Sequence, residues 1–153
     1  MKVALCLSGQ PRVVEVGFQK LNETILKNND VDVFIHTWFD EENLSTQSVI
    51  PGREGHRLSS DAIDSLQSLY KPKVLMVEHP KVWKRTFEYP QKTFDRAHTW
   101  ALEVPSGLDD AKAYLNNNTH CMWYSLMMSN LIKEQYSSET GVQYDWIIRN
   151  RID

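Results

Sequence analysis

Long apolar runs are missing from this sequence of 153 residues. No stretch approaches the roughly 18 consecutive apolar residues that a transmembrane helix needs. The apolar stretch in the opening segment MKVALCLSGQPR is too short for a secretion signal. Cysteine is also scarce, because Cys6 and Cys121 are the only two and lack the spacing of metal ligands. We therefore expect two buried thiols in a reducing compartment and a cytoplasmic protein.

Strong charge of either sign is absent as well. The formal net charge of −3 gives no basic field that would favour nucleic acid or an anionic membrane as a partner. Apolar residues make up 41% and charged residues 24% of the chain, as in ordinary globular proteins. A chain of this length can bury a core of its own. We predict one domain over residues 1–153.

The first part of the chain alternates between strand and helix patterns. Lys2 to Leu7 is an apolar run without alternation, which is typical of a strand covered on both faces. Val14, Phe18, Leu21 and Ile25 then recur at helical spacing, before the β-branched and aromatic strand Val31 to Phe39. A strand, helix and strand in this order predict parallel strands joined by a right-handed crossover.

The rest of the chain continues the alternation. Ser59 or Ser60 is expected to cap a helix that bears Ile63, Leu66 and Tyr70 and ends at Pro72. The further expected segments are a strand Lys73 to His79, a helix from about Leu108 or Asn118 to Tyr136, and a strand Tyr144 to Ile152. Asp40 to Ser59 is expected to form a long lid or binding loop, and Pro80 to Pro105 an irregular segment. The pattern predicts an α/β protein, a Rossmann-like three-layer αβα sandwich with a mainly parallel sheet.

Polar residues follow three of the expected strands, in the segments SGQPR, HTWFD and RNRID. In an open parallel sheet, ligands bind beyond the carboxyl ends of the strands, where the strand order reverses. Gly9 allows close approach of backbone to a ligand, Ser8 and Gln10 offer neutral hydrogen-bonding groups, and Arg12 suits phosphate or carboxylate. The segment matches neither standard phosphate-binding glycine loop. An ordinary turn between strand and helix is the alternative.

The last ten residues, YDWIIRNRID, are the stronger signal. Alternation along a strand puts Ile147, Arg149, Arg151 and Asp153 on one face. Arg149 then needs a partner within the domain, because an unpaired charge inside a covered sheet is costly. Farther along, the Asp153 carboxylate could hold a divalent cation and Arg151 could contact phosphate oxygens. A surface cluster of ion pairs is the alternative.

The HTW segment contributes two further candidates, Thr37 and Trp38. Trp38 lies at a strand's carboxyl end, where its ring could stack on a base or sugar. His36 could touch the ligand, although a buried, hydrogen-bonded role is the commoner one for a single histidine. The five histidines show no paired metal-ligand spacing.

These segments together resemble GT-A-type glycosyltransferases of the kind found in bacterial surface-glycan loci and large DNA viruses. Such proteins carry SGQ.R after the first strand, D(V/I)F(I/V)HTW in the second, YS....N.LK..Y in a later helix, and then YD.(I/V)IR.R.D. The matching residues here are Ser8, Gly9, Gln10, Arg12, Asp32 to Trp38, Tyr124, Ser125, Asn130, Lys133, Tyr136, Tyr144, Asp145, Arg149, Arg151 and Asp153.

The resemblance implies a nucleotide-diphosphate sugar as ligand and a glycan as acceptor. In the family, the first loop binds the donor nucleotide, and R-x-D takes the place of the D-x-D motif that holds Mn²⁺ or Mg²⁺ on the diphosphate. Asp153 would then be the metal ligand, and Arg151, which replaces the first aspartate, would bear part of the phosphate charge.

Three functions are consistent with these residues. The first is a glycosyltransferase, or its donor-binding N-terminal portion. The second is a non-enzymatic nucleotide-binding module, or an inactive fragment, that acts with a partner chain. The third is a nucleotide hydrolase, for which no nucleophile or carboxylate pair is evident. The chain ends where the family continues with acceptor-binding elements, so we expect an incomplete GT-A fold. An unpaired last strand would then favour self-association or a partner chain.

Overall fold

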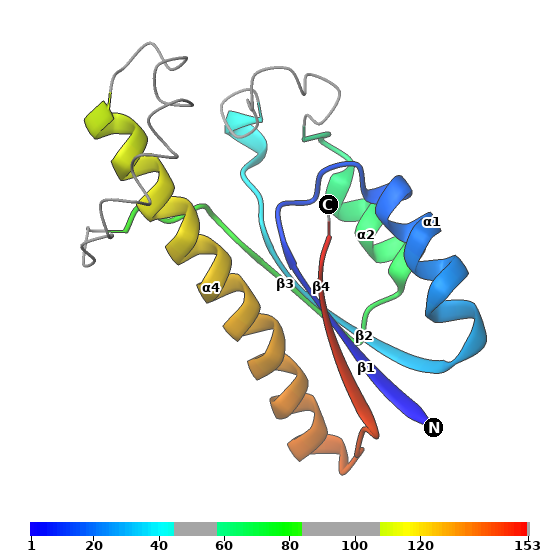
Figure 1. Ribbon diagram of the computed structural model, residues 1–153. Coiled ribbons are helices and arrows are strands. Elements are labelled where there is room, and N and C mark those ends of the chain that lie inside the picture. The colour runs from blue at the N-terminus through cyan, green and yellow to red at the C-terminus, as the bar shows by residue number, and fades with distance from the viewer. Residues whose placement is uncertain (45–57, 84–107, 153) are drawn as a thin grey trace. The chain divides into compact units, whose positions relative to one another are not determined.

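A computed structural model describes residues 1–44, 58–83 and 108–152 of the chain. Strands and helices alternate along it (Figure 1). The helices longer than one turn are α1 (Val14–Thr24), α2 (Ala62–Tyr70) and α4 (Leu108–Thr140), and the short 3₁₀ segments are Leu26–Asn28 and Glu41–Asn43. The strands are β1 (Lys2–Gly9), β2 (Asp30–Trp38), β3 (Val74–Glu78) and β4 (Trp146–Arg151).

The four strands form one sheet in which every described pairing is parallel, in the order β3-β2-β1-β4. Ala4 of β1 is flanked by Asp32 of β2 and Ile147 of β4. The predicted α/β class and parallel sheet are therefore confirmed, and the topology is compatible with a Rossmann-like fold.

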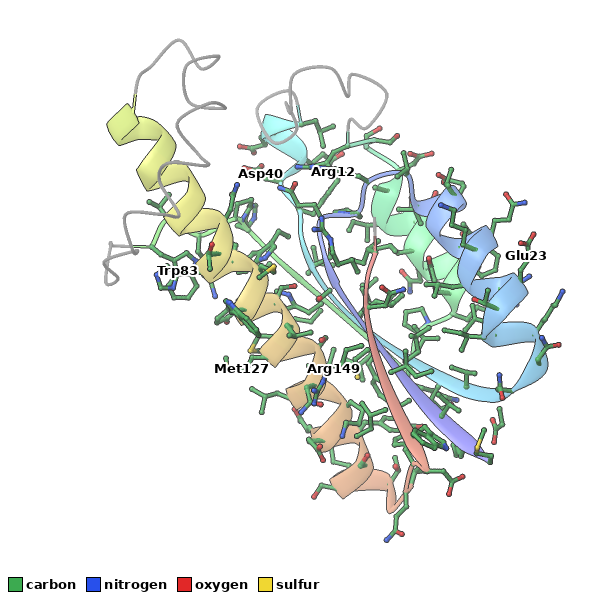
Figure 2. The ribbon with its side chains drawn as sticks, viewed as in Figure 1. Arg12, Glu23, Asp40, Trp83, Met127 and Arg149 are labelled. Carbon is green, nitrogen blue, oxygen red and sulfur yellow. The ribbon has the colours of Figure 1, made fainter. Side chains whose placement is uncertain are left out.

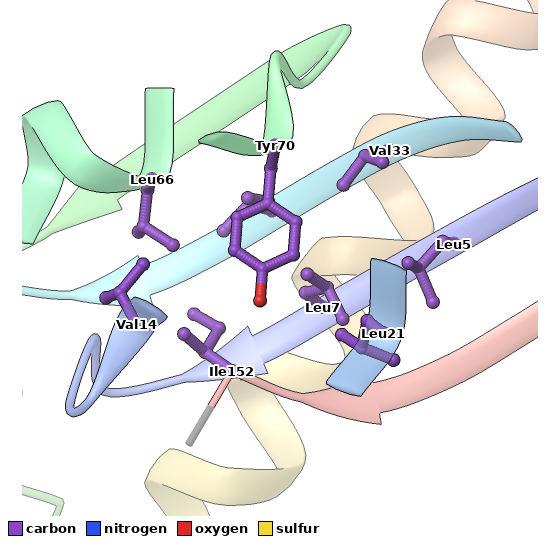
Figure 3. Close-up of a cluster of buried hydrophobic side chains, with 9 residues drawn as sticks. Leu5, Leu7, Val14, Leu21, Val33, Leu66, Tyr70 and Ile152 are labelled. Carbon is purple, nitrogen blue, oxygen red and sulfur yellow. The ribbon is translucent and has the colours of Figure 1, made fainter. Parts of the chain in front are cut away.

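Helices cover both faces of this sheet, as the unbroken apolar pattern of the first strand predicts. On one face, Leu5, Leu7, Val33 and Ile35 pack with Val14 and Leu21 of α1 and with Leu66 and Tyr70 of α2 (Figure 3). On the other face, Ala4, Cys6 and Phe34 pack with Ile132 and Tyr136 of α4. β1 therefore contributes alternate side chains to two cores.

Two helix ends differ from the predictions. The N-cap of α2 is Asp61, and the Ser59 hydroxyl donates to the Asp61 carboxylate instead of capping the helix itself. α4 runs beyond the predicted Tyr136 to Thr140, because the polar residues after Tyr136 stay helical until Gly141 adopts a left-handed φ of 73°.

Contacts divide the chain into two units. One comprises Met1–Pro80 with Tyr124–Asp153 and holds the sheet, and the other is Lys81–Trp123. Within the described part of the second unit, the Trp83 backbone amide donates to Asn117 Oδ1 over 2.8 Å, and the Trp83 ring stacks on His120. Among the described helices, none combines the length and the apolar character needed to cross a bilayer. The predicted lid and the irregular segment fall mostly at positions 45–57 and 84–107, outside the described residues.

Candidate ligand site at the carboxyl edge of the sheet

The strand order reverses between β1 and β4. From β1 the chain moves outward to β2 and then β3, and afterwards returns to place β4 on the other side of β1. Neighbouring strands whose connections leave in opposite directions leave room for a ligand beyond their carboxyl ends. The two strand ends at this position are those that lead into SGQPR and RID.

The first loop and the end of β4 lie side by side. Ser8 and Arg151 are register partners, and the Ile152 amide donates to the Ser8 carbonyl over 3.1 Å. Ser8 is buried in the ladder, whereas Arg151 is exposed. The predicted convergence of these two segments is therefore confirmed. Asp153, the predicted metal ligand, lies outside the described residues.

Gly9 is held by side chains from two other elements. Its φ of 119° is open to glycine and strained for other residues. Its amide donates to Ser125 Oγ of α4 over 3.0 Å, and its carbonyl accepts from Thr37 Oγ1 of β2 over 2.9 Å. The conformation of the loop is thus set by β2 and α4 together.

Gln10 and Arg12 lie after Gly9 and are both half-buried. Arg12 Nη2 donates to Gln10 Oε1, which turns the two side chains toward each other, and the Arg12 backbone bridges to Leu58. Figure 2 places Arg12 at the edge where β1 and β2 end. The next residue, Val13, takes a left-handed conformation with φ 43° at the start of α1, which is unusual for a β-branched residue.

Thr37 and Trp38 are packed inside the unit. The Thr37 side chain is fully buried and donates to Gly9. Trp38 is 3% exposed, and its ring contacts His36 edge-on and Tyr124 in a tilted arrangement, with centroids 4.9 and 5.3 Å apart. Thr37 therefore holds the loop through Gly9, and Trp38 packs against His36 and Tyr124. Contact of either residue with a ligand stays a prediction.

A buried chain of polar groups at this edge was not anticipated from the sequence. His36 is 0% exposed, with Nδ1 2.7 Å from Ser125 Oγ and Nε2 2.8 Å from Glu78 Oε2. Ser125 Oγ also receives the Gly9 amide. The sequence does mark His36, at a strand's end, and Ser125, in the helix motif, as residues of interest. No spacing in the sequence connects either of them to Glu78.

The order serine, histidine, carboxylate is that of a hydrolytic triad. Here, however, Ser125 is 0% exposed, and its hydroxyl already bonds the Gly9 amide. A nucleophile must reach a substrate carbonyl or phosphorus atom, and a fully buried hydroxyl does not. These residues thus form a structural connection between β2, β3, α4 and the first loop.

The β4 side chains alternate as predicted. Ile148 of β4 and Ile152 just after it pack on the α1 and α2 face. Arg149 lies beside α4 (Figure 2), where its Nη2 donates to Asn130 Oδ1 over 3.2 Å. The expected partner of Arg149 is therefore an amide of the neighbouring helix, and the arginine remains exposed.

Within residues 1–44, 58–83 and 108–152, no group of three or more histidine, cysteine, aspartate or glutamate residues could hold a metal ion. The nearby Asp40 carboxylate accepts the Glu42 amide over 3.1 Å and caps the 3₁₀ turn that follows β2. The predicted binding of Mn²⁺ or Mg²⁺ at this edge therefore depends on Asp153.

The opposite edge of the sheet has a structural ion network. Buried Asp32 accepts from the Tyr144 hydroxyl over 2.9 Å and lies 3.3 Å from Lys2 Nζ and 3.6 Å from Lys73 Nζ. Burial, and then the hydrogen bond to Asp32, raise the pKa of Tyr144. Asp145 Oδ2 accepts the Lys2 backbone amide over 2.6 Å. The YD pair of the last motif therefore anchors β4 far from the candidate site.

Comparison with family models, curated proteins and solved structures returned no match for this chain. The residues themselves, and the geometry of the sheet edge, are the basis for inferring a function.

Proposed function

We propose that this chain binds a nucleotide-diphosphate sugar and a divalent cation, as the donor-binding part of a GT-A-type glycosyltransferase. One observation carries the proposal: the reversal of strand order lies between β1 and β4, the two strands whose ends carry SGQPR and RID. A ligand at such a reversal would meet residues from both segments.

The residue chemistry supports a diphosphate at this edge. Arg12 and Arg151 bring two guanidinium groups to the ends of β1 and β4, and guanidinium matches the geometry of phosphate oxygens. Breaking a sugar–diphosphate bond leaves negative charge on the diphosphate, which a divalent cation would neutralise when bound. In this proposal, Asp153 holds the cation, Mn²⁺ or Mg²⁺, and Arg151 contacts phosphate.

A thermal-shift panel tests the proposal. UDP, GDP, TDP and CDP, each with and without Mn²⁺, should raise the melting temperature for at least one member, since a ligand that binds only the folded state stabilises it. Arg151→Ala should weaken this shift with or without metal. Lys27→Ala removes an exposed cation just before β2 begins, away from the strands' carboxyl ends, and is the matched control. If no nucleotide shifts melting at millimolar concentration, the proposal is wrong.

The metal assignment has its own experiment. Asp153→Asn should abolish the difference between nucleotide binding with and without Mn²⁺ while leaving the melting temperature of the free protein unchanged. Equal metal dependence in wild type and Asp153→Asn would remove Asp153 from the site.

A nucleotide-binding module that acts with a second chain is the other candidate, and exposed apolar side chains favour it. Among the described strands, β4 lies at the edge of the sheet, where Trp146 is 63% and Ile147 43% exposed, and Met127 and Leu131 of α4 are exposed as well. Unpaired strand edges with apolar neighbours promote association. We propose that the isolated chain self-associates, or needs a partner chain, and transfers no sugar alone. Light scattering after size exclusion and a transferase assay with mixed acceptors test this; a monomer that transfers sugar would contradict it.

A further inference from the structure

The buried ring of His36 occupies an unusual position for a histidine. It is 0% exposed at the carboxyl end of β2, directly beneath the first loop, and both ring nitrogens have side-chain partners from other elements. Glu78 of β3 lies at Nε2, and Ser125 of α4 lies at Nδ1. Among the described residues, the rings of Trp38 and Tyr124 also contact the His36 ring in edge-to-face arrangements. A buried polar group with two specific partners has little freedom to move.

The Ser125 hydroxyl connects the fixed His36 ring to the first loop. Its hydroxyl is 2.7 Å from His36 Nδ1 and 3.2 Å from the His36 carbonyl, and it accepts the Gly9 amide over 3.0 Å. Because Nε2 must carry a proton to donate to the Glu78 carboxylate, the hydroxyl donates to Nδ1 of a neutral ring. In a ring protonated on both nitrogens, Nδ1–H donates to the hydroxyl and the hydroxyl donates to the carbonyl. In both arrangements, Ser125 Oγ remains the acceptor for Gly9.

We propose that Glu78, His36 and Ser125 form a positioning relay that fixes the Gly9 peptide and thereby sets the affinity of the first loop for its ligand. None of the three needs to touch the ligand. The inference rests on the proposed function for the identity of the ligand, a nucleoside diphosphate. The holding of Gly9 is a property of the free protein and can be measured separately.

Gly9 is the appropriate residue for such control. Its φ of 119° is available to glycine alone at low cost, and Thr37 holds its carbonyl while Ser125 holds its amide. If the amide is released, the Ser8 carbonyl of the same peptide still accepts the Ile152 amide, but the φ of Gly9 is less restricted, and the groups that follow it, Gln10 and Arg12, change position. The chemistry of the ligand-binding groups is unchanged, but their geometry is no longer fixed in advance.

The structure offers a matched control for Ser125. Ser129 lies one turn later on the same face of α4 and is also 0% exposed, but its hydroxyl donates to Leu126 O of its own helix over 2.9 Å. Ser125→Ala and Ser129→Ala therefore remove the same atom from equally buried positions, and only the first removes the acceptor for Gly9.

Amide hydrogen exchange and ¹H–¹⁵N spectra of the free protein test the relay. We expect Ser125→Ala to speed exchange of the Gly9 amide by about fivefold, as for loss of one hydrogen bond, and to shift its resonance. Ser129→Ala should leave both unchanged. Glu78→Gln keeps a hydrogen-bonding group at His36 Nε2 and should shift the ¹⁵N resonances of the ring with a smaller effect on Gly9. Unchanged Gly9 exchange in Ser125→Ala would overturn the relay. If Ser125→Ala does not fold, unchanged His36 ring resonances in Glu78→Gln would overturn it.

Binding is then measured by calorimetry with the nucleoside diphosphate that shifts wild-type melting most, in the presence of Mn²⁺. Loss of one hydrogen bond worth about 1 kcal/mol predicts about fivefold weaker binding for Ser125→Ala, and no change for Ser129→Ala. If wild type binds none of the four nucleotides, the proposed function fails, while the Gly9 measurements still decide whether the relay exists. If wild type binds and Ser125→Ala binds equally well, the relay does not set affinity.

Discussion

Gly17 of α1 lies directly against the carbonyl oxygen of Ile152, so a Cβ atom at position 17 would overlap that oxygen. The same Cβ would be 3.4 Å from the Tyr70 hydroxyl. The absence of a side chain at Gly17 therefore allows α1 to pack closely on the end of β4, next to the candidate site. Ile152 is itself 0% exposed in the core that α1 and α2 cover.

Gly17→Ala should destabilise the protein, against the usual trend. Alanine in a helix is ordinarily favoured over glycine by roughly 0.5–1 kcal/mol, but here the added methyl group forces α1 and β4 apart, at a cost of about 1–3 kcal/mol. Urea unfolding measures the net effect, and Gln19→Ala at an exposed position of α1 is the control. A more stable Gly17→Ala protein would show that the packing is looser than described.

Removing the Tyr70 hydroxyl should leave the free energy of unfolding unchanged or raise it, whereas Gly17→Ala should lower it. Tyr70 is 5% exposed, no hydrogen-bond partner of its hydroxyl lies among the described residues, and burial raises its pKa. Its ring points from α2 toward Leu7 and Ile152 (Figure 3). Tyr70→Phe should be neutral or stabilise the protein by up to about 1 kcal/mol, because an unsatisfied buried hydroxyl is removed.

Tyr144→Phe is the matched comparison for Tyr70→Phe. The Tyr144 hydroxyl donates to the buried Asp32 carboxylate, so its removal should cost about 1.5–3 kcal/mol, as for other hydrogen bonds to charged groups. Chemical unfolding of both variants gives the difference, and equal effects would contradict these hydrogen-bond assignments.

The residues that follow α2 and α4 both adopt left-handed backbone, so adding glycine at one and removing it at the other should change stability in opposite directions. Lys71 follows α2 with φ 45°, and Gly141 follows α4 with φ 73°. Left-handed backbone costs roughly 1 kcal/mol for residues with a Cβ and little for glycine. Lys71→Gly should therefore raise stability by about 0.5–1 kcal/mol, and Gly141→Ala, with open space around its position, should lower it by a similar amount. Thermal melts that move in the same direction would contradict this.

The two cysteines should differ in reactivity. Cys6 is 0% exposed and burial raises its pKa to about 11, whereas Cys121 is only partly buried. Since the thiolate is the reactive form, iodoacetamide at pH 8 should label Cys121 first and Cys6 only when the protein unfolds. Mass spectrometry with and without guanidinium measures this. Labelling of Cys6 at the rate of Cys121 in the folded protein would be inconsistent with its burial.

Alkaline pH should destabilise the fold through the same thiol. The folded-state pKa of Cys6 is raised from 9.0 to about 11, so the protonated thiol is favoured in the folded state. This contribution is complete below the unfolded pKa of 9.0 and is lost as pH rises toward 11. The raised pKa of Tyr144 acts in the same direction at higher pH. Unfolding midpoints from pH 8 to 11 should fall, and Cys6→Ala should flatten that slope.

Much of the fold follows from local sequence patterns. The unbroken apolar run from Lys2 to Leu7 indicates a strand covered on both faces, and its residues do divide between two cores. The alternation in β4 correctly separates Ile152 from Arg149. These predictions succeed because side-chain direction in a strand depends only on the backbone of that strand.

Contacts between elements far apart in the sequence were harder to predict from it. His36 and Ser125 are 89 positions apart, and His36 and Glu78 are 42 apart. No local pattern pairs them, because their contact depends on where α4 and β3 pack against β2. Trp38 illustrates the same limit: its place at the strand's end does not reveal that its ring packs against Tyr124 of α4 and is only 3% exposed.

By itself, the sequence determined the strands, the helices, their faces and the polar segments at the strand ends, since each depends on residues close together in the chain. Only the tertiary structure decided that β4 pairs with β1 and not with β3, which brings Arg151 beside Ser8, and that Gly9 is held from α4 and β2. Strand order and buried polar contacts come from the packing of whole elements, and that packing minimises exposed apolar surface and unpaired polar groups over the entire sheet at once.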